Sequence, residues 1–145
     1  MNYNSLKVAA LTLAVALMLA GAPMSFAADK TAGQKIDETA QSIKNYSAEQ
    51  RDDALRSAKK VLDDADARID HFESEVSKNW DKMNASARKH AQETLRAMRQ
   101  QRQDLSQRYG ELKRSSAKAW DEVKGGFSKS YEALRNSFSR AAKEF

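Results

Sequence analysis

The last third of the chain repeats with a period of eleven residues. Residues 108–118, 119–129 and 130–140 align without gaps as RYGELKRSSAK, AWDEVKGGFSK and SYEALRNSFSR, and AAKEF begins a fourth copy. Eleven residues make almost three whole turns of an α-helix, so equivalent positions stay on one side of it. The repeat therefore predicts a long helix that lays one apolar stripe along another surface.

The second, fifth and ninth positions of the repeat carry this stripe. At about 100° per residue they fall within an arc of about 60°, a narrow face that favours packing of helix on helix. Trp and Tyr beside Lys and Arg also suit a membrane surface, so lipid is the alternative. The predicted packing or lipid-facing stripe is Tyr109, Leu112, Trp120, Val123, Phe127, Tyr131, Leu134, Phe138 and Phe145.

Two consecutive glycines, Gly125 and Gly126, interrupt the repeat in composition but not in phase. They occupy its seventh and eighth positions, opposite the stripe. Each Gly costs a helix about 1 kcal/mol relative to Ala. We expect a hinge on the solvent side of a continuing helix, with a full turn as the alternative.

A seven-residue pattern precedes the repeat. Ser47 and Gln50 form a predicted capping box at its start. Two apolar rows at spacings of three and four are typical of a coiled coil, so residues 48–82 are expected to form a first helical arm. Ala58, Ala65 and Phe72 make one row, and the predicted seam is Leu55, Leu62, Ile69, Val76 and Met83.

Near Met83 the apolar spacing changes, and Asn84 is a candidate N-cap for a second arm over residues 85–145. The chain either turns here or continues as one rod with a stutter. Residues 28–83 carry 10 basic and 13 acidic side chains, whereas residues 84–145 carry 14 and 7. A turn would fold the acidic arm onto the basic one and is therefore favoured.

The N-terminus resembles a secretory signal. Lys7 precedes a thirteen-residue apolar run at residues 8–20, Gly21 and Pro23 follow, and Ala27 ends a small-residue site. The run is shorter than the roughly 20 residues of a membrane span. Residues 1–27 are therefore predicted to be a signal peptide cleaved before Ala28, with an uncleaved anchor as the alternative. The mature chain would be exported to the periplasm.

Beyond the leader the chain has no Cys, no Pro and four Gly, which predicts nearly continuous helix. Residues 28–46 are polar and expected to be partly disordered. Residues 47–145 are predicted to form one helical coiled-coil domain. The expected class is all-α: an elongated antiparallel helical hairpin or coiled coil with a C-terminal eleven-residue-repeat helix.

Few residues suggest chemistry. His71 lies near several carboxylates, but the spacing matches no metal motif, and a solvated acidic face is expected instead. His90 is expected to be a partly buried histidine beside the seam. No enzyme activity, cofactor or metal is therefore predicted. A row at spacing three is either an anion patch or a solubilising face paired with the acidic arm: Arg96, Arg99 and Arg102.

Residues 115–145 resemble a family of small coiled-coil stress-response proteins first noted in cyanobacteria. The match rests on residues 119–124 (AWDEVK), on Gly126 and on Tyr131 in the next repeat. Residues 85–113 resemble exported proteobacterial relatives of that family, and the repeat is similar to apolipoprotein-like and desiccation-protein-like helices. The resemblance implies a helical, non-enzymatic, stress-linked protein.

These observations lead to two functional hypotheses. The first is a non-enzymatic exported protein that acts by helix–helix contact, as a stress-protective periplasmic factor that self-associates or binds other periplasmic proteins. The alternative is a peripheral binder of anionic membrane surfaces through the basic, aromatic C-terminal helix. Neither nucleic acid nor a small-molecule substrate is expected as a partner.

Overall fold

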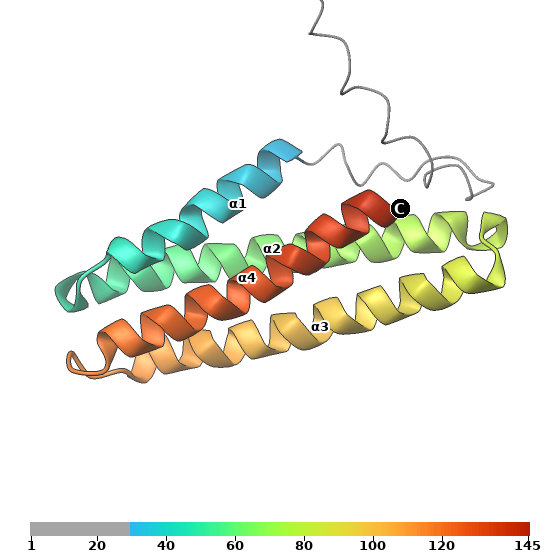
Figure 1. The fold of residues 1–145 in the computed structure, drawn as a ribbon. Coiled ribbons are helices and arrows are strands. Elements are labelled where there is room, and N and C mark those ends of the chain that lie inside the picture. The colour runs from blue at the N-terminus through green and yellow to red at the C-terminus, as the bar shows by residue number, and fades with distance from the viewer. Residues whose placement is uncertain (1–29) are drawn as a thin grey trace, which may run out of the picture.

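The computed structural model of the protein describes residues 30–145, which form four α-helices and no strand (Figure 1). The all-α prediction is confirmed. The helices are α1 (Lys30–Ser42), α2 (Arg51–Asn79), α3 (Ala85–Arg114) and α4 (Trp120–Glu144). Short 3-10 turns occur at η3 (Ile43–Asn45), η4 (Ala48–Gln50) and η5 (Trp80–Lys82).

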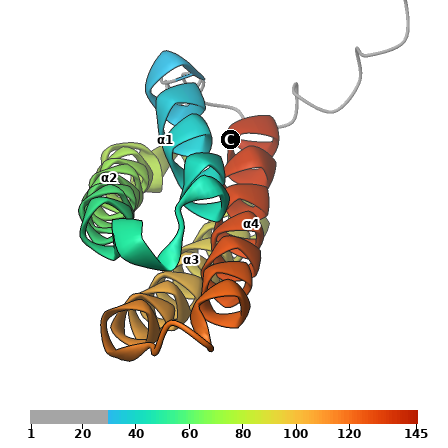
Figure 2. The ribbon, with the colours of Figure 1, turned by 90° about the vertical axis from the view of Figure 1, so that its left-hand side faces the viewer.

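The helices pack as an up-down-up-down bundle around one core. Helix α3 lies between α2 and α4, and α1 packs against both α2 and α4 on the other side (Figure 2). Helix α1 has 13 residues and α2 has 29, so α1 covers only part of the length of α2. The tip of the α2–α3 hairpin consequently extends beyond the start of α1 (Figure 1).

Both apolar rows of α2 contribute to this core. Leu62, Ile69, Val76 and Met83 of the predicted seam are buried, and Leu55 is half-buried. The second row lies deeper, because its members have no exposed surface: Ala58, Ala65 and Phe72. Full burial of a side chain the size of Leu or Phe contributes about 1.5–3 kcal/mol. The heptad therefore marks the face by which α2 stabilises the bundle.

The chain turns between α2 and α3 rather than continuing as a rod. After η5, Met83 is extended, and the Asn84 side chain accepts a hydrogen bond from the Ala87 N–H at 2.8 Å. The predicted N-cap is thus confirmed. It satisfies one of the amide groups that a helix start leaves unpaired.

The turn brings the acidic helix against the basic one. Arg102 donates two hydrogen bonds to the Asp66 carboxylate, at 2.7 and 2.8 Å, and Arg99 pairs with Glu73 at 2.5 Å. Two of the three arginines in the predicted anion patch are therefore occupied by α2, while Arg96 is exposed. The pairing favours the solubilising face over the anion patch.

The N-terminal segment differs from expectation. Residues 28–46 were expected to be partly disordered, but α1 and η3 pack Ile36, Ala40 and Ile43 into the core. These residues are spaced by four and three and share one helical face. The expected signal peptide at residues 1–27 lies outside the described residues. Within the described part of the chain, no helix combines the length and apolar character needed to cross a membrane.

The second arm also differs from expectation. It was predicted to run through residues 85–145 with a hinge at residues 125–126, but α3 ends at Arg114 and the chain reverses at residues 115–119. Helix α4 then passes through both glycines without a break. The Arg51 guanidinium donates to the Ser115 carbonyl, and the Ser115 hydroxyl donates to the Leu112 carbonyl. These bonds satisfy carbonyls that the helix end leaves free.

We predict that Gly125→Ala stabilises the protein. An added Cβ at Gly125 would meet nothing within 4 Å, and Ala exceeds Gly in helix propensity by about 1 kcal/mol. At Gly126 the Cβ would lie 3.6 Å from the Arg108 side chain, an ordinary contact, so Gly126→Ala is the matched comparison. Urea unfolding followed by circular dichroism measures both variants. A loss of stability in Gly125→Ala would show that the helix bends at this position.

Candidate functional site

Helix α4 touches every other helix of the bundle, and the surface that receives it is the candidate site. We call this the α4-binding surface. It comprises side chains and main-chain carbonyls of α1, η3, α2 and α3. Its members with specific contacts to α4, or to Phe145 directly after it, are Asp37, Lys44, Tyr46, Arg51, Arg68, Phe72, His90 and Gln101.

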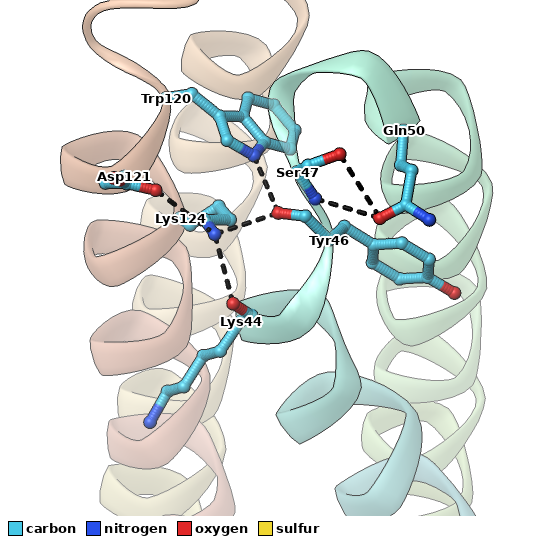
Figure 3. Close-up of polar contacts among 7 residues, drawn as sticks. All are labelled: Lys44, Tyr46, Ser47, Gln50, Trp120, Asp121 and Lys124. Carbon is cyan, nitrogen blue, oxygen red and sulfur yellow. Dashed lines mark hydrogen bonds and ion pairs between the residues drawn. The ribbon is translucent and has the colours of Figure 1, made fainter.

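The first turn of α4 forms hydrogen bonds with the connection between α1 and α2 (Figure 3). The indole Nε1–H of Trp120 donates to the Tyr46 carbonyl at 2.9 Å. The Lys124 ammonium donates to the same oxygen at 2.8 Å and to the Lys44 carbonyl at 3.0 Å. A 3-10 turn ends here with Tyr46 extended, so these carbonyls need partners from outside the turn. Two donors from a distant helix supply them.

Neighbouring side chains position both the Tyr46 carbonyl and the Lys124 ammonium. The Ser47 N–H donates to the Gln50 side chain at 3.0 Å, so the predicted capping box is present; it starts η4, which leads into α2 at Arg51 (Figure 3). Asp121 accepts an ion pair from Lys124 at 3.3 Å. The Lys124 side chain is only 12% exposed, so its charge depends on these oxygens for solvation.

The middle of α4 is fixed to α1 by one carboxylate. The Tyr131 hydroxyl donates to one oxygen of Asp37, and Arg135 Nε lies 3.2 Å from the other. Burial raises the pKa of Tyr131 well above its usual value. The hydrogen bond to Asp37 and the charge of that carboxylate raise the pKa further, whereas Arg68 and Arg135 lower it. Tyr131 is therefore held as a neutral hydrogen-bond donor.

The C-terminal part of α4 contacts α2 and α3. The Ser137 hydroxyl donates to Gln101 at 2.5 Å, and the Arg68 guanidinium lies 4.1 Å from the Phe138 ring centroid. Phe145 stacks on His90 with centroids 5.5 Å apart and meets Phe72 edge-on at 5.4 Å.

His90 also meets Glu144, with its Nε2 2.6 Å from the carboxylate. His90 was expected to be partly buried, but its side chain is 49% exposed. His90 covers the C-terminal end of α4 from outside instead of joining the seam. It lies on the side of α3 that faces α4, next to Glu144 and Phe145.

The structure places the predicted stripe inside the bundle. Its buried members are Leu112, Trp120, Phe127, Tyr131, Leu134 and Phe138, and its half-buried members are Tyr109, Val123 and Phe145. Sequence reasoning missed the polar partners of the stripe. The spacing of Lys124 four residues after Trp120 was a usable signal for one helical face. The carbonyls of Lys44 and Tyr46 left no signal, because every residue has a carbonyl.

The acidic residues around His71 do not converge. Within residues 30–145 no group of three His, Asp or Glu side chains is placed to hold a metal ion. The contacts that the α4-binding surface makes are hydrogen bonds, ion pairs and aromatic packing.

We predict that Lys124→Met destabilises the protein more than Lys129→Met does. Met keeps much of the apolar stem of Lys but removes the donor to two carbonyls, which costs about 1–3 kcal/mol. Lys129 is exposed on the same helix and serves as the control, with an expected change within about 0.5 kcal/mol. Chemical unfolding measures both free energies. Equal effects would mean that the carbonyl contacts contribute nothing specific.

We predict that Tyr131 makes stability fall at alkaline pH. In the unfolded chain a tyrosine loses its proton near pH 10, whereas folded Tyr131 keeps it. The unfolded state then binds fewer protons, so the free energy of unfolding decreases as pH rises above about 10. Because Tyr131→Phe lacks this titration, its stability deficit relative to wild type should shrink between about pH 8 and pH 11. A constant deficit in urea titrations would contradict the prediction.

One comparison with known proteins identifies a relationship. The family model described as "Vesicle transport v-SNARE protein N-terminus" matches residues 30–113, which is 84 of the 145 residues. No curated protein and no solved structure matches the chain. The matched segment begins where α1 begins and ends at the last turn of α3, so α4 lies outside it.

This match corrects several expectations. The resemblance to cyanobacterial stress-response proteins was wrong as an assignment of family, because the family model that matches residues 30–113 is one of vesicle transport. The periplasmic location, the stress-protective role and the alternative of an anionic-membrane binder are likewise wrong, because the family is one of vesicle transport. Its members act by protein–protein association and not as enzymes. The chain belongs to the family of vesicle transport v-SNARE protein N-terminal domains.

Proposed function

We propose that this chain is a non-enzymatic protein-binding module of vesicle transport, and that its α1–α3 domain binds an amphipathic helix on the α4-binding surface. The observation that carries the proposal is the position of α4. The family segment ends with α3, and the surface that α1–α3 presents is covered by a helix from outside that segment. Helix α4 thus serves as an example of the ligand class that this surface accepts.

The contacts of α4 indicate what a partner helix must carry. A Trp and a Lys four residues apart reach the Tyr46 carbonyl from the first turn. A hydroxyl eleven residues after that Trp, supplied here by Tyr131, reaches Asp37. On the same face of the helix, apolar residues at helical spacing fill the core, as Phe127 and Leu134 do. Apolar helices are common, so the polar positions supply specificity in this recognition pattern.

The partner must also compete with α4. An intramolecular helix has a high effective concentration, so an unmodified chain should bind a second helix weakly. A partner in vesicle transport would need either a better match to the polar positions or a chain in which α4 has been displaced. Binding in trans should therefore increase when the stripe of α4 is weakened.

A labelled peptide of residues 119–145 tests the proposal. The chain has no Cys, so one added Cys places a dye at a single position of the peptide. We expect weak binding to wild type and at least about tenfold tighter binding to full-length Phe127→Asp/Phe138→Asp, because an acidic side chain in the core displaces α4. Fluorescence anisotropy gives the affinities.

Two controls accompany this measurement. Ala133→Asp/Asn136→Asp adds the same charge on the exposed side of α4 and should bind the peptide as weakly as wild type does. A peptide with Trp120→Ala and Lys124→Ala should bind less tightly than the native peptide. If the core variant retains its helical circular dichroism and still shows no saturable binding, the surface is not a helix-binding site.

A further inference from the structure

The reversal between α3 and α4 lies in a segment whose sequence favours helix. Residues 115–119 read SSAKA and contain neither Gly nor Pro. The side-chain bonds within the reversal come from two serines: the Ser115 hydroxyl donates to Leu112 O, and the Ser116 hydroxyl accepts from the Ala119 N–H. The longer-range bond from Arg51 to Ser115 completes it. The turn is therefore maintained by contacts and not by residues that exclude a helix.

The apolar pattern continues in phase across this reversal. The buried residues of α3 are seven apart, at Ala91, Met98, Leu105 and Leu112, and α4 continues with Trp120 and Phe127. If residues 85–144 formed one helix, the buried hydrophobic side chains of both parts would lie within an arc of about 100° around the helix axis. Two helices separated by a turn do not need their buried faces to be in phase. One continuous helix needs both parts to face the same side.

A continuous helix also meets the geometric requirement for exchange between two copies. It would contain 60 residues and span about 90 Å. Its first half would stay on α2 of its own copy. Its second half would lie beyond that bundle with its stripe on the same side, where the α4-binding surface of a second, end-to-end copy would face it. Every contact of α4 could then form again between copies.

We infer that the chain has a second assembly state, a domain-swapped dimer. In this state α3 and α4 of each copy join into one helix, and each α4 occupies the α4-binding surface of the other copy. The partner is a second copy because the interface is the one that already exists within one chain, and only the five residues of the reversal change conformation. The inference does not depend on a vesicle-transport partner, so it can fail while binding of a foreign helix still holds.

The test compares three full-length chains that are refolded at micromolar and at millimolar concentration and then sized by light scattering. Wild type should form a dimer fraction that grows with concentration. Ser115→Ala/Ser116→Ala removes both side-chain bonds of the reversal and raises helix propensity, so its association constant should rise by about tenfold. Ala117→Pro should remain monomeric, because Pro suits the second position of the Ser116–Ala119 turn but breaks a helix interior.

A disulfide distinguishes exchange from side-by-side association. Gln101→Cys/Ser137→Cys places a thiol pair at two side chains that touch across α3 and α4, in a chain with no other Cys. In a swapped dimer these thiols lie on different chains, so the oxidised dimer fraction should run as covalent dimers on a denaturing gel. In any unswapped dimer the bond stays within one chain.

Three results would overturn the inference. The first is a monomer at all concentrations in both wild type and the double Ala variant. The second is a dimer whose disulfide stays within single chains. The third is an Ala117→Pro chain that dimerises as wild type does. Circular dichroism checks that Ala117→Pro keeps wild-type helicity, and Ala117→Ser, which should dimerise like wild type, controls for substitution at this exposed residue.

Discussion

The carbonyl oxygen of Tyr46 joins the connection between α1 and α2 to the first turn of α4. It accepts hydrogen bonds from both Trp120 and Lys124, which lie more than seventy residues later in the chain. A helix is stiff and rises 1.5 Å per residue, so fixing its first turn fixes the height of every later residue. The contacts of Tyr131 with Asp37 and of Ser137 with Gln101 follow from that starting point. A shift of α4 by one turn would break these polar contacts.

Polar contacts select the arrangement of the bundle, while apolar burial supplies most of its stability. The stripe of α4 and the rows of α2 are patterns that many helix pairs could satisfy. Ion pairs at the surface, such as Arg99 with Glu73, contribute at most about 1 kcal/mol each. Their position is nevertheless informative, because Arg99 and Arg102 step along α3 opposite Glu73 and Asp66 of an antiparallel α2. A parallel or slipped pairing of these helices would lose this correspondence.

The sequence predicted the features marked by a repeat or by a local capping motif and missed those that depend on contacts distant in the chain. Periodicity located the burial of Leu62, Ile69, Phe127 and Leu134, and a local side-chain bond marked the helix start at Asn84. The reversal at residues 115–119 was missed because its long-range partner, Arg51, lies 64 residues earlier. The family was missed because the aromatic stripe, the most noticeable pattern in the sequence, does not identify a family. A stripe of aromatic residues is a general device of helix packing, and the residues that carry the family relationship, 30–113, contain no comparable short motif.

The order of the helices along the chain has a consequence during synthesis. Helix α4, with 25 residues, is made after α1, α2 and α3. At about 5–20 residues per second, α1–α3 are complete for one to several seconds before α4 can cover them. During that interval the apolar side chains that will surround Phe127 and Phe138 face solvent on every nascent copy. Neighbouring ribosomes on one message would therefore hold several uncovered copies close together before their α4 helices emerge.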